Sequence, residues 1–304
     1  EELRIYEIAD RKIQGLQPIV REVLPDIAQI HDALVLGIKD YFQKSGFKQA
    51  VLGLSGGIDS AIVCALACRA LGAENVMAVL MPSKYSSDHS IQDALDLVEN
   101  TGCMHEIIAI AAAADAFDQM LAPAFKGLPF NLAEENIQAR CRGIVAMAMS
   151  NKFGYILLNT SNKSECAVGY GTLYGDMCGA IGVIGDVYKT QIYQLTDYIN
   201  KDGEVIPKNT VVKPPSAELR PGQMDSDSLP DYDTLDAILF QYIELRKSSA
   251  AIIAQGFDEA LVRRVIKMVN NAEFKRYQTP PILRVSPKAF GMGRRMPIVG
   301  KYLS

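Results

Sequence analysis

Short apolar runs alternate with helix-type segments from residue 29 to residue 158, and this alternation limits the fold more than any other feature. We predict strands over 50–54, 76–81, 104–110 and 155–158, and helices over 29–47, 60–71, 88–100 and 132–151. Such alternation favours an α/β fold with a doubly wound parallel sheet and helices on both faces. Ligands of that architecture bind beyond the carboxyl ends of the strands, so motifs at those ends are candidates for function.

The composition of the sequence changes past residue 200, where a polar stretch contains several prolines and aspartates. We interpret 202–232 as a long loop that could serve as a lid, because structureless loops of this length are usually functional or disordered. Helices are predicted over 233–254 and 257–270. At the other end, we interpret residues 1–28 as a lead-in or linker and 29–304 as one domain.

The charge balance excludes some classes of function. The chain has 31 Lys and Arg against 35 Asp and Glu, a formal net charge of -4, and a pI near 5.5. It shows no basic stripe of the kind that marks a nucleic-acid partner. No apolar run approaches the ~20 residues needed to span a bilayer, and the first residues, EELRIYEIADRK, do not form a signal peptide. We therefore expect a cytoplasmic protein without a membrane or nucleic-acid partner.

Six cysteines occur without any CxxC pair, at positions 64, 68, 103, 141, 166 and 178. Cys64 and Cys68 are four residues apart and would share one face of a helix. A metal site there would need two further ligands, and no nearby His or Cys pair supplies them in the sequence. The favoured interpretation is packed, reduced thiols.

The most informative motif is the string LSGGIDS, which begins at residue 54, directly after one predicted strand and before the next predicted helix. Gly56 and Gly57 allow a tight turn whose N–H groups can approach an anion, and the helix N-terminus favours phosphate. Ser55 and Ser60 can donate hydroxyl hydrogen bonds. Asp59 beside a phosphate suggests a Mg²⁺ ligand. The loop has no lysine, so it is not a Walker A motif. The alternative is a plain strand–helix turn.

This loop resembles the pyrophosphate-binding loop of the N-type ATP pyrophosphatases. The resemblance implies an adenine nucleotide α-hydrolase-like fold and a reaction that cleaves ATP between its α and β phosphates. Members of that superfamily pass through an adenylylated intermediate. The loop by itself identifies the superfamily and not the member.

Five further segments resemble the NAD synthetase family. They are ENIQARCR (135–142), NTSNKSE (159–165), GYGTLYGD (169–176), DVYKTQ (186–191) and KPPSAEL (213–219). The resemblance covers about residues 30–300. Two positions depart from the family pattern, since Asn159 stands where glycine is usual and Ser216 where threonine is common. The segments 81–88 and 280–290 resemble the glutamine-dependent members, whose N-terminal glutaminase domain is not found in this sequence.

The resemblance implies three sets of site residues. Those expected to bind ATP are Ser55, Gly56, Gly57, Ser60, Met81, Arg142, Thr160, Lys189 and Ser216. Those expected to bind deamido-NAD are Asn136, Arg140, Tyr170 and Asp176. Asp59 and Glu165 would hold Mg²⁺, and Asp59, Lys189 and Asp176 are the expected catalytic residues.

Several of these residues also have ordinary structural interpretations. Lys189 at a helix start is unfavourable for the helix dipole, which favours an anionic ligand over a surface lysine. Arg140 and Arg142 point about 200° apart on a helix, which fits two ligands, although one of them could form a surface salt bridge. Tyr170 could stack on a ring of the substrate, as could Tyr174, or either could pack in the core.

The implied function is ATP-dependent amidation of deamido-NAD to NAD by a carbon–nitrogen ligase, with release of AMP and pyrophosphate. Ammonia is the nitrogen donor, drawn from glutamine in a full-length parent, and Asp176 is the candidate to orient or deprotonate it. The family also implies a homodimer, with helix 132–151 as the candidate interface. One alternative is another amidotransferase such as GMP synthetase, which the run 159–176 argues against. A second is an inactive nucleotide-binding module.

Overall fold

The computed structural model describes residues 6–9, 12–13 and 26–300. Most of the segment interpreted as a lead-in or linker, 1–28, therefore lies outside the described residues. Within it, β1 (Ile8–Ala9) pairs antiparallel with β2 (Lys12–Ile13). The main body begins with α1 (Asp26–Ser45), three residues earlier than predicted.

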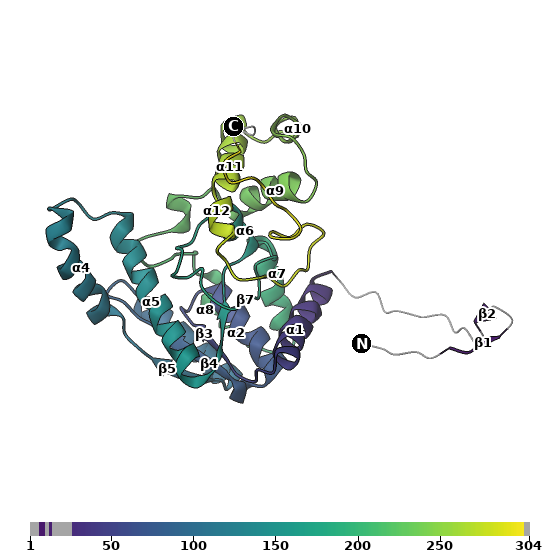
Figure 1. Cartoon of the computed structure of the whole chain (residues 1–304), viewed down its shortest axis with the longest axis horizontal. Coiled ribbons are helices and arrows are strands. Elements are labelled where there is room, and N and C mark those ends of the chain that lie inside the picture. Colours follow the sequence, from purple (N-terminus) through teal and green to yellow (C-terminus); the bar gives the residue numbers. More distant parts are fainter. Residues whose placement is uncertain (1–5, 10–11, 14–25, 301–304) are drawn as a thin grey trace.

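Five parallel strands form the central sheet in the order β5-β4-β3-β6-β7 (Figure 1). They are β3 (Ala50–Gly53), β4 (Val76–Leu80), β5 (Met104–Ile107), β6 (Ile156–Asn159) and β7 (Ile181–Gly182). Strand order reverses between β3 and β6, which pair through Ala50↔Ile156 and Val51↔Leu157. This reversal creates a topological switch point, the usual ligand position in such sheets.

Helices cover both faces of the sheet, as predicted (Figure 1). On one face lie α1, α2 (Ile58–Leu71), α3 (Asp88–Thr101) and α7 (Lys189–Ile199), and on the other lie α4 (Ala111–Phe125) and α5 (Leu132–Phe153). A separate apolar core lies on each face of the sheet. Adjacent residues of β3 point into different cores, since Leu52 packs on the α2 side and Val51 on the α5 side. Burial of both faces explains why the strands read as continuous apolar runs.

A second apolar cluster combines one short helix from the middle of the chain with three helices nearer the C-terminus. They are α6 (Lys163–Val168), α9 (Tyr232–Ile243), α10 (Ser249–Ile253) and α11 (Glu259–Asn271), and α12 (Glu273–Arg276) follows α11. Leu235, Leu239 and Val265 are fully buried there. The chain then returns to the sheet, where Gly182 N donates to Pro281 O at 2.8 Å and Leu283 N donates to Gly182 O at 3.1 Å.

Three predicted segments differ from the structure. The single helix over 233–254 is two helices, because α9 ends at Ile243, Arg246 adopts φ +54°, and Ser248 caps α10. The loop over 202–232 contains α8 (Lys208–Val212) and a 3₁₀ turn at Asp225–Asp227. The strand over 104–110 ends at Ile107, and α4, with Pro123 inside it, was not predicted.

Within the described part of the chain, no helix is both long enough and apolar enough to cross a membrane.

Candidate active site

The glycine loop lies at the carboxyl end of β3, beside the switch point, and its serines hold its shape. Ser60 Oγ donates to Gly57 O at 3.0 Å, and Ser55 Oγ accepts from Gly57 N at 3.2 Å. The two hydroxyls are 3.2 Å apart. The loop therefore leads directly into α2, whose first-turn amides and positive dipole end face the opening beyond the sheet.

The backbone at residue 56 lies so close to α3 that only glycine fits there. Its φ is +80°, and a Cβ at this position would lie 2.1 Å from the backbone oxygen of Ser90. No side chain can occupy that space without moving the start of α3. The second glycine of the motif, Gly57, has no such contact with another segment, since its added Cβ would meet only Ser55 Oγ at 3.3 Å.

Asn159, at the carboxyl end of β6, has a defined role although glycine is usual there. Its Nδ2 donates to Asp176 O at 2.8 Å and to Cys178 O at 3.0 Å. Its Oδ1 accepts from Ser161 N at 3.0 Å. The buried amide thus holds the 176–178 segment against the strand end, so the departure from the family pattern adds contacts.

Asp59, Glu165 and Lys189 meet beside the glycine loop although up to 130 residues separate them. Lys189 Nζ forms an ion pair with Asp59 and lies 3.8 Å from Glu165 Oε1. Asn162 contacts both carboxylates, because its Nδ2 donates to Asp59 Oδ1 at 2.9 Å and its backbone N donates to Glu165 Oε2 at 3.4 Å. The Lys189 side chain is only 2% exposed.

The start of α7 is arranged to hold this lysine. Lys189 N donates to Ser164 Oγ at 2.9 Å, and Ser164 Oγ in turn donates to the carboxylate of Asp236. Asp236 Oδ2 also accepts from Thr190 N at 2.8 Å. A carboxylate at this helix N-terminus offsets the unfavourable placement of a cation there.

When Glu165 is ionised, this cluster carries two negative charges against the one positive charge of Lys189. Burial, and then the neighbouring Asp59, raise the pKa of Glu165 well above its usual value. Burial alone would lower the pKa of Lys189, but Asp59 and Glu165 outweigh burial and raise it, so the lysine stays charged. Two carboxylates against one ammonium suit a divalent cation, and carboxylate oxygens are ligands that Mg²⁺ accepts.

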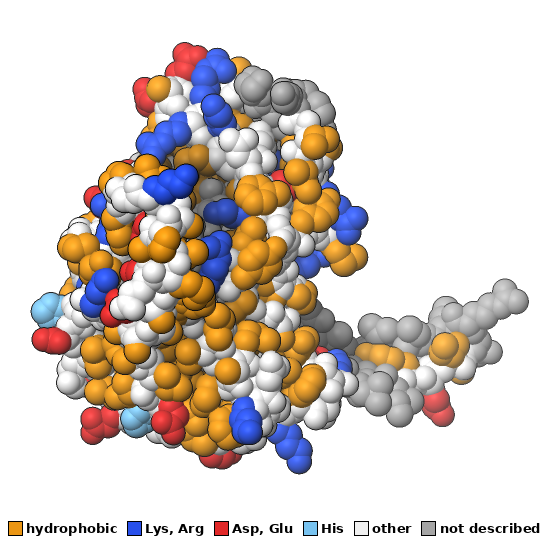
Figure 2. Space-filling model, turned by 60° about the vertical axis from the view of Figure 1, so that its left-hand side comes forward, with side chains coloured by type: hydrophobic (Ala, Val, Ile, Leu, Met, Phe, Trp, Pro, Cys, Tyr) orange, Lys and Arg blue, Asp and Glu red, His pale blue; other side chains and the backbone are white. Residues whose placement is uncertain are grey.

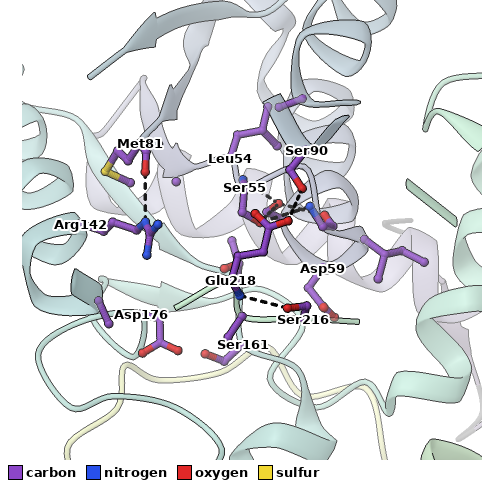
Figure 3. Close-up of a pocket in the computed structure, with 18 of the residues that line it drawn as sticks. Leu54, Ser55, Asp59, Met81, Ser90, Arg142, Ser161, Asp176, Ser216 and Glu218 are labelled. Carbon is purple, nitrogen blue, oxygen red and sulfur yellow. Dashed lines mark hydrogen bonds between the residues drawn. The ribbon is translucent and has the colours of Figure 1, made fainter. Parts of the chain in front are cut away.

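Arg142 and Asp176 lie across the cavity from the loop (Figure 3). Arg142 Nε donates to Met81 O at 3.1 Å, and burial lowers the pKa of the guanidinium. Burial also raises the pKa of Asp176, whose Oδ1 accepts from Thr172 N at 2.6 Å.

The segment after α8 folds over the glycine loop, and it contains two residues that the sequence analysis did not single out. Lys213 Nζ donates to Gly56 O at 3.1 Å and to Ser90 Oγ at 3.0 Å. The Glu218 carboxylate accepts from Ser90 Oγ at 2.7 Å (Figure 3) and also accepts from Ser87 Oγ at 2.9 Å. Both residues belong to the string KPPSAEL (213–219), so its resemblance to the NAD synthetase family could have pointed to them.

Most of the residues predicted for the site line one cavity of ≈ 300 Å³. They are Ser55, Gly57, Asp59, Ser60, Met81, Arg142, Thr160, Glu165, Tyr170, Asp176, Lys189 and Ser216. Tyr170 is fixed there, because its hydroxyl donates to Asp225 Oδ1 at 3.1 Å. Asp225, a buried carboxylate of the same cavity, is a further residue that the sequence analysis missed.

Two of the residues predicted to bind substrate lie on the outer side of the turn at 172–175, outside this cavity. Arg140 Nε donates to Leu173 O at 3.3 Å, and Asn136 Oδ1 accepts from Thr172 Oγ1 at 2.7 Å. Tyr174 in that turn is 66% exposed. The expected divergence of Arg140 from Arg142 is confirmed, since Arg142 alone faces the cavity.

The strand order, and a glycine loop that opens a helix at the switch point, define an α/β protein of the adenine nucleotide α-hydrolase-like class. Comparison with protein families gives a match to the NAD synthase model over residues 30–279. The chain belongs to the NAD synthase family.

Individual relatives agree with this assignment. A curated glutamine-dependent NAD(+) synthetase from Synechocystis is 50% identical over 293 residues, which are 96% of this chain and 52% of that protein. The chain thus spans about half the length of the curated relatives it matches. A solved glutamine-dependent NAD+ synthetase from Acinetobacter baumannii, in complex with ADP, is 42% identical with TM-score 0.66, over 99% of this chain and 55% of that one. An NMN synthetase from Francisella tularensis is 28% identical with TM-score 0.70, over 82% and 95% of the respective chains.

The close approach at Gly56 gives a prediction about stability. Gly56→Ala should cost ~1–3 kcal/mol more than Gly102→Ala, because overpacking against a backbone atom adds to the strain of a left-handed residue. Gly102 is a matched control, with φ +69° and nothing within 4 Å of its added Cβ. Urea unfolding of both variants measures the difference. Equal losses would show that the contact with Ser90 carries no cost.

The raised pKa of Glu165 gives a prediction about pH. Its folded-state pKa lies above the unfolded value, so protonation stabilises the fold below about pH 4, and this stability is lost as pH rises through the folded pKa. Glu165→Gln should therefore be more stable than the parent at neutral pH, and the gain should vanish in acid. Glu259→Gln, in an exposed pair with Arg263, is the control and should change little. A loss of stability in Glu165→Gln at neutral pH would contradict the prediction.

Proposed function

We propose that this chain catalyses the ATP-dependent amidation of deamido-NAD to NAD, with ammonia as nitrogen donor and AMP and pyrophosphate as the other products. The observation that carries the proposal is the meeting of Asp59, Glu165 and Lys189 beside the glycine loop, in one cavity of a chain from the NAD synthase family.

The glycine loop and α2 would bind the pyrophosphate part of ATP. Ser55, Gly57 and Ser60 line that part of the cavity, and a helix N-terminus beside a glycine turn favours an anion. Lys189 adds a positive charge, since Asp59 and Glu165 raise the pKa of its ammonium. Thr160 lines the same cavity and can donate a further hydrogen bond to a phosphate oxygen. Ser216 also lines it, but its Oγ donates to Gln223 O at 2.5 Å, so this hydroxyl would have to exchange that partner for phosphate.

Asp59 and Glu165 would hold Mg²⁺. The fit rests on the burial of Glu165 next to a second carboxylate, an arrangement that a divalent cation relieves. When bound, Mg²⁺ supplies charge neutralisation on the phosphate oxygens.

The chemistry then proceeds in two displacements. The nicotinate carboxylate attacks the α-phosphorus, the bond from that phosphorus to the bridging oxygen breaks, and pyrophosphate leaves. Ammonia attacks the activated carbonyl, loses a proton, and AMP leaves. The chain contributes mainly position and charge to the first step. Asp176, whose burial raises its pKa, is the residue that we assign to orient ammonia or accept its proton.

The direct test mixes the chain with ATP, Mg²⁺, deamido-NAD and either ammonium chloride or ammonia-free glutamine. We expect NAD and AMP in equal amounts from ammonium, and no NAD from glutamine, because the residues described above form a synthetase site and no glutaminase site. Chromatography of the nucleotides measures both products. Robust NAD formation from glutamine alone would contradict the assignment of the nitrogen source.

Two other acceptors belong in the same assay. Nicotinate mononucleotide is the natural rival, because one solved relative is named an NMN synthetase. Xanthylate tests the GMP synthetase alternative. We expect deamido-NAD to be preferred, since the relatives with higher identity are NAD synthetases. Faster amidation of another acceptor would contradict deamido-NAD as the substrate, although the type of reaction would remain as proposed.

Asp59→Asn tests the metal and phosphate role. The variant keeps the shape of the side chain and the hydrogen bond from Asn162, but it removes the charge. We expect turnover to fall at least ~100-fold, a loss that added Mg²⁺ does not restore. Asp40→Asn is the control, since Asp40 pairs with Lys44 on the surface of α1 and should leave turnover unchanged. Near-parental turnover of Asp59→Asn at saturating Mg²⁺ would remove Asp59 from the mechanism.

We also propose that two copies of the chain form a homodimer through α4 and α5. Figure 2 brings this side forward and shows hydrophobic side chains over much of it. The exposed apolar residues of these helices and their connection are Met120, Leu128, Phe130, Leu132, Ile144, Met147 and Phe153. Because Asn136 and Arg140 lie on α5 outside the cavity, a second copy would cover them and complete a deamido-NAD site.

Light scattering of the parent and of Ile144→Glu measures the assembly. The parent should have twice the mass of the chain at micromolar concentration, and Ile144→Glu should be a monomer with reduced activity. Met292→Glu, at an 84% exposed apolar residue elsewhere, should remain dimeric. A fully active monomeric parent would contradict the proposal.

The proposed setting is the cytoplasm, where the six free thiols would stay reduced. The proposed partners are small molecules and a second copy of the chain.

A further inference from the structure

Three cysteines that take no part in the proposed reaction meet in the core on the α2 side of the sheet. Cys64 and Cys68 lie one turn apart on α2, and Cys103 directly precedes β5. The sulfur atoms of Cys64 and Cys103 are 3.8 Å apart, and all three sulfurs lie within 4.8 Å of one another. None of the three lines the nucleotide cavity. The sequence analysis found no further ligand for Cys64 and Cys68, and the fold supplies one from 35 residues away.

The spacing of these sulfurs is that of ligands around one metal ion. A tetrahedral Zn²⁺ with Zn–S bonds of about 2.3 Å places its sulfur ligands about 3.8 Å apart. The Cys64–Cys103 distance already has this value. The Cys68 sulfur lies on the same helix face as Cys64 and within 4.8 Å of the other two sulfurs.

Burial and donor type select the ion. Cys64 and Cys103 are 0% and 6% exposed, whereas Cys68 is half-buried, so Cys68 marks the entrance and the side open to a water ligand. Three thiolates favour a soft d¹⁰ cation over Mg²⁺, so this position would not compete for the ion proposed at Asp59 and Glu165. Binding releases the three thiol protons, and the cation then offsets charge that would otherwise be costly in the core.

We propose that Cys64, Cys68 and Cys103 form a binding site for one thiophilic d¹⁰ cation, Zn²⁺ being the reference ion, with water as fourth ligand. The ion would join the C-terminal half of α2 to the start of β5. It would therefore link the helix that follows the glycine loop to an edge strand of the sheet.

The test titrates Zn²⁺ and Cd²⁺ into the reduced, metal-free chain in the presence of a competing chelator. We expect one ion per chain, thiolate-to-Cd²⁺ charge-transfer absorption, and a higher unfolding temperature with Zn²⁺. Cys103→Ser and Cys68→Ser should each weaken binding at least ~10-fold and lower the absorption per bound Cd²⁺, because one of the three thiolate ligands is lost. Circular dichroism checks that each variant is folded, and Cys68→Ser tolerates the change best because its site is half-buried. Cys141→Ser, at a buried cysteine on α5, is the matched control and should bind as the parent does.

Three outcomes would overturn the proposal. The first is the absence of binding to the reduced parent. The second is a loss of binding in Cys68→Ser but not in folded Cys103→Ser, which would indicate a single accessible thiol. The third is Cd²⁺ binding without thiolate absorption, which would place the ion on carboxylates.

Discussion

The buried ammonium of Lys189 is the interaction on which the arrangement of this protein depends. It pairs with Asp59 in the first turn of α2 and lies 3.8 Å from Glu165 in α6, while its own backbone begins α7. Three helices from distant parts of the sequence therefore meet at one charge. Removing such a charge from water is costly, and the cost is recovered only when every remaining donor and acceptor has a partner. Asn162 and Ser164 supply those partners.

The same network joins the two halves of the structure. Asp236 belongs to α9, in the C-terminal helical cluster, yet it accepts from the start of α7 on the sheet. A second buried lysine, Lys163 at the start of α6, also pairs with two carboxylates. They are those of Asp186 and of Glu244, which directly follows α9. The C-terminal helices are thus tied to the sheet by charge as well as by apolar packing. Geometry at the site and stability of the second cluster are consequently linked.

What the sequence predicted follows from local rules. The strand–helix alternation predicted the α/β class, and the string at residues 54–60 predicted a turn from a strand into a helix; both are confirmed. The opposite directions of Arg140 and Arg142 followed from helix geometry alone. The failures have local causes too. Alanines at the start of α4 gave no amphipathic pattern, and apolar residues of 233–254 continued a helical period across the break at Arg246.

Other features could not be read from any window of the sequence. The contacts of Lys213 and Glu218 with Ser90 span more than 120 residues, and no periodicity encodes them. Asn159 looked like a departure from a glycine pattern until its amide was seen to hold the 176–178 segment. Cys103 joined Cys64 only through the pairing of β5 with β4. The convergence of Asp59 and Lys189 was expected from family resemblance, because local physics does not bring residues 130 apart together.

The two edges of the sheet are protected in different ways, which matters for aggregation. At β7 the segment 281–283 continues the hydrogen bonding, and Ile282 fills the space above Gly182 and Gly185, so the open backbone on that side is capped by the chain itself. That segment lies beyond the residues matched by the family model, which end at 279. At β5 the edge is short and carries exposed His105 and Glu106, polar side chains that discourage strand addition. A chain shortened after residue 279 would keep every residue proposed for the reaction and expose a bare strand edge to its neighbours.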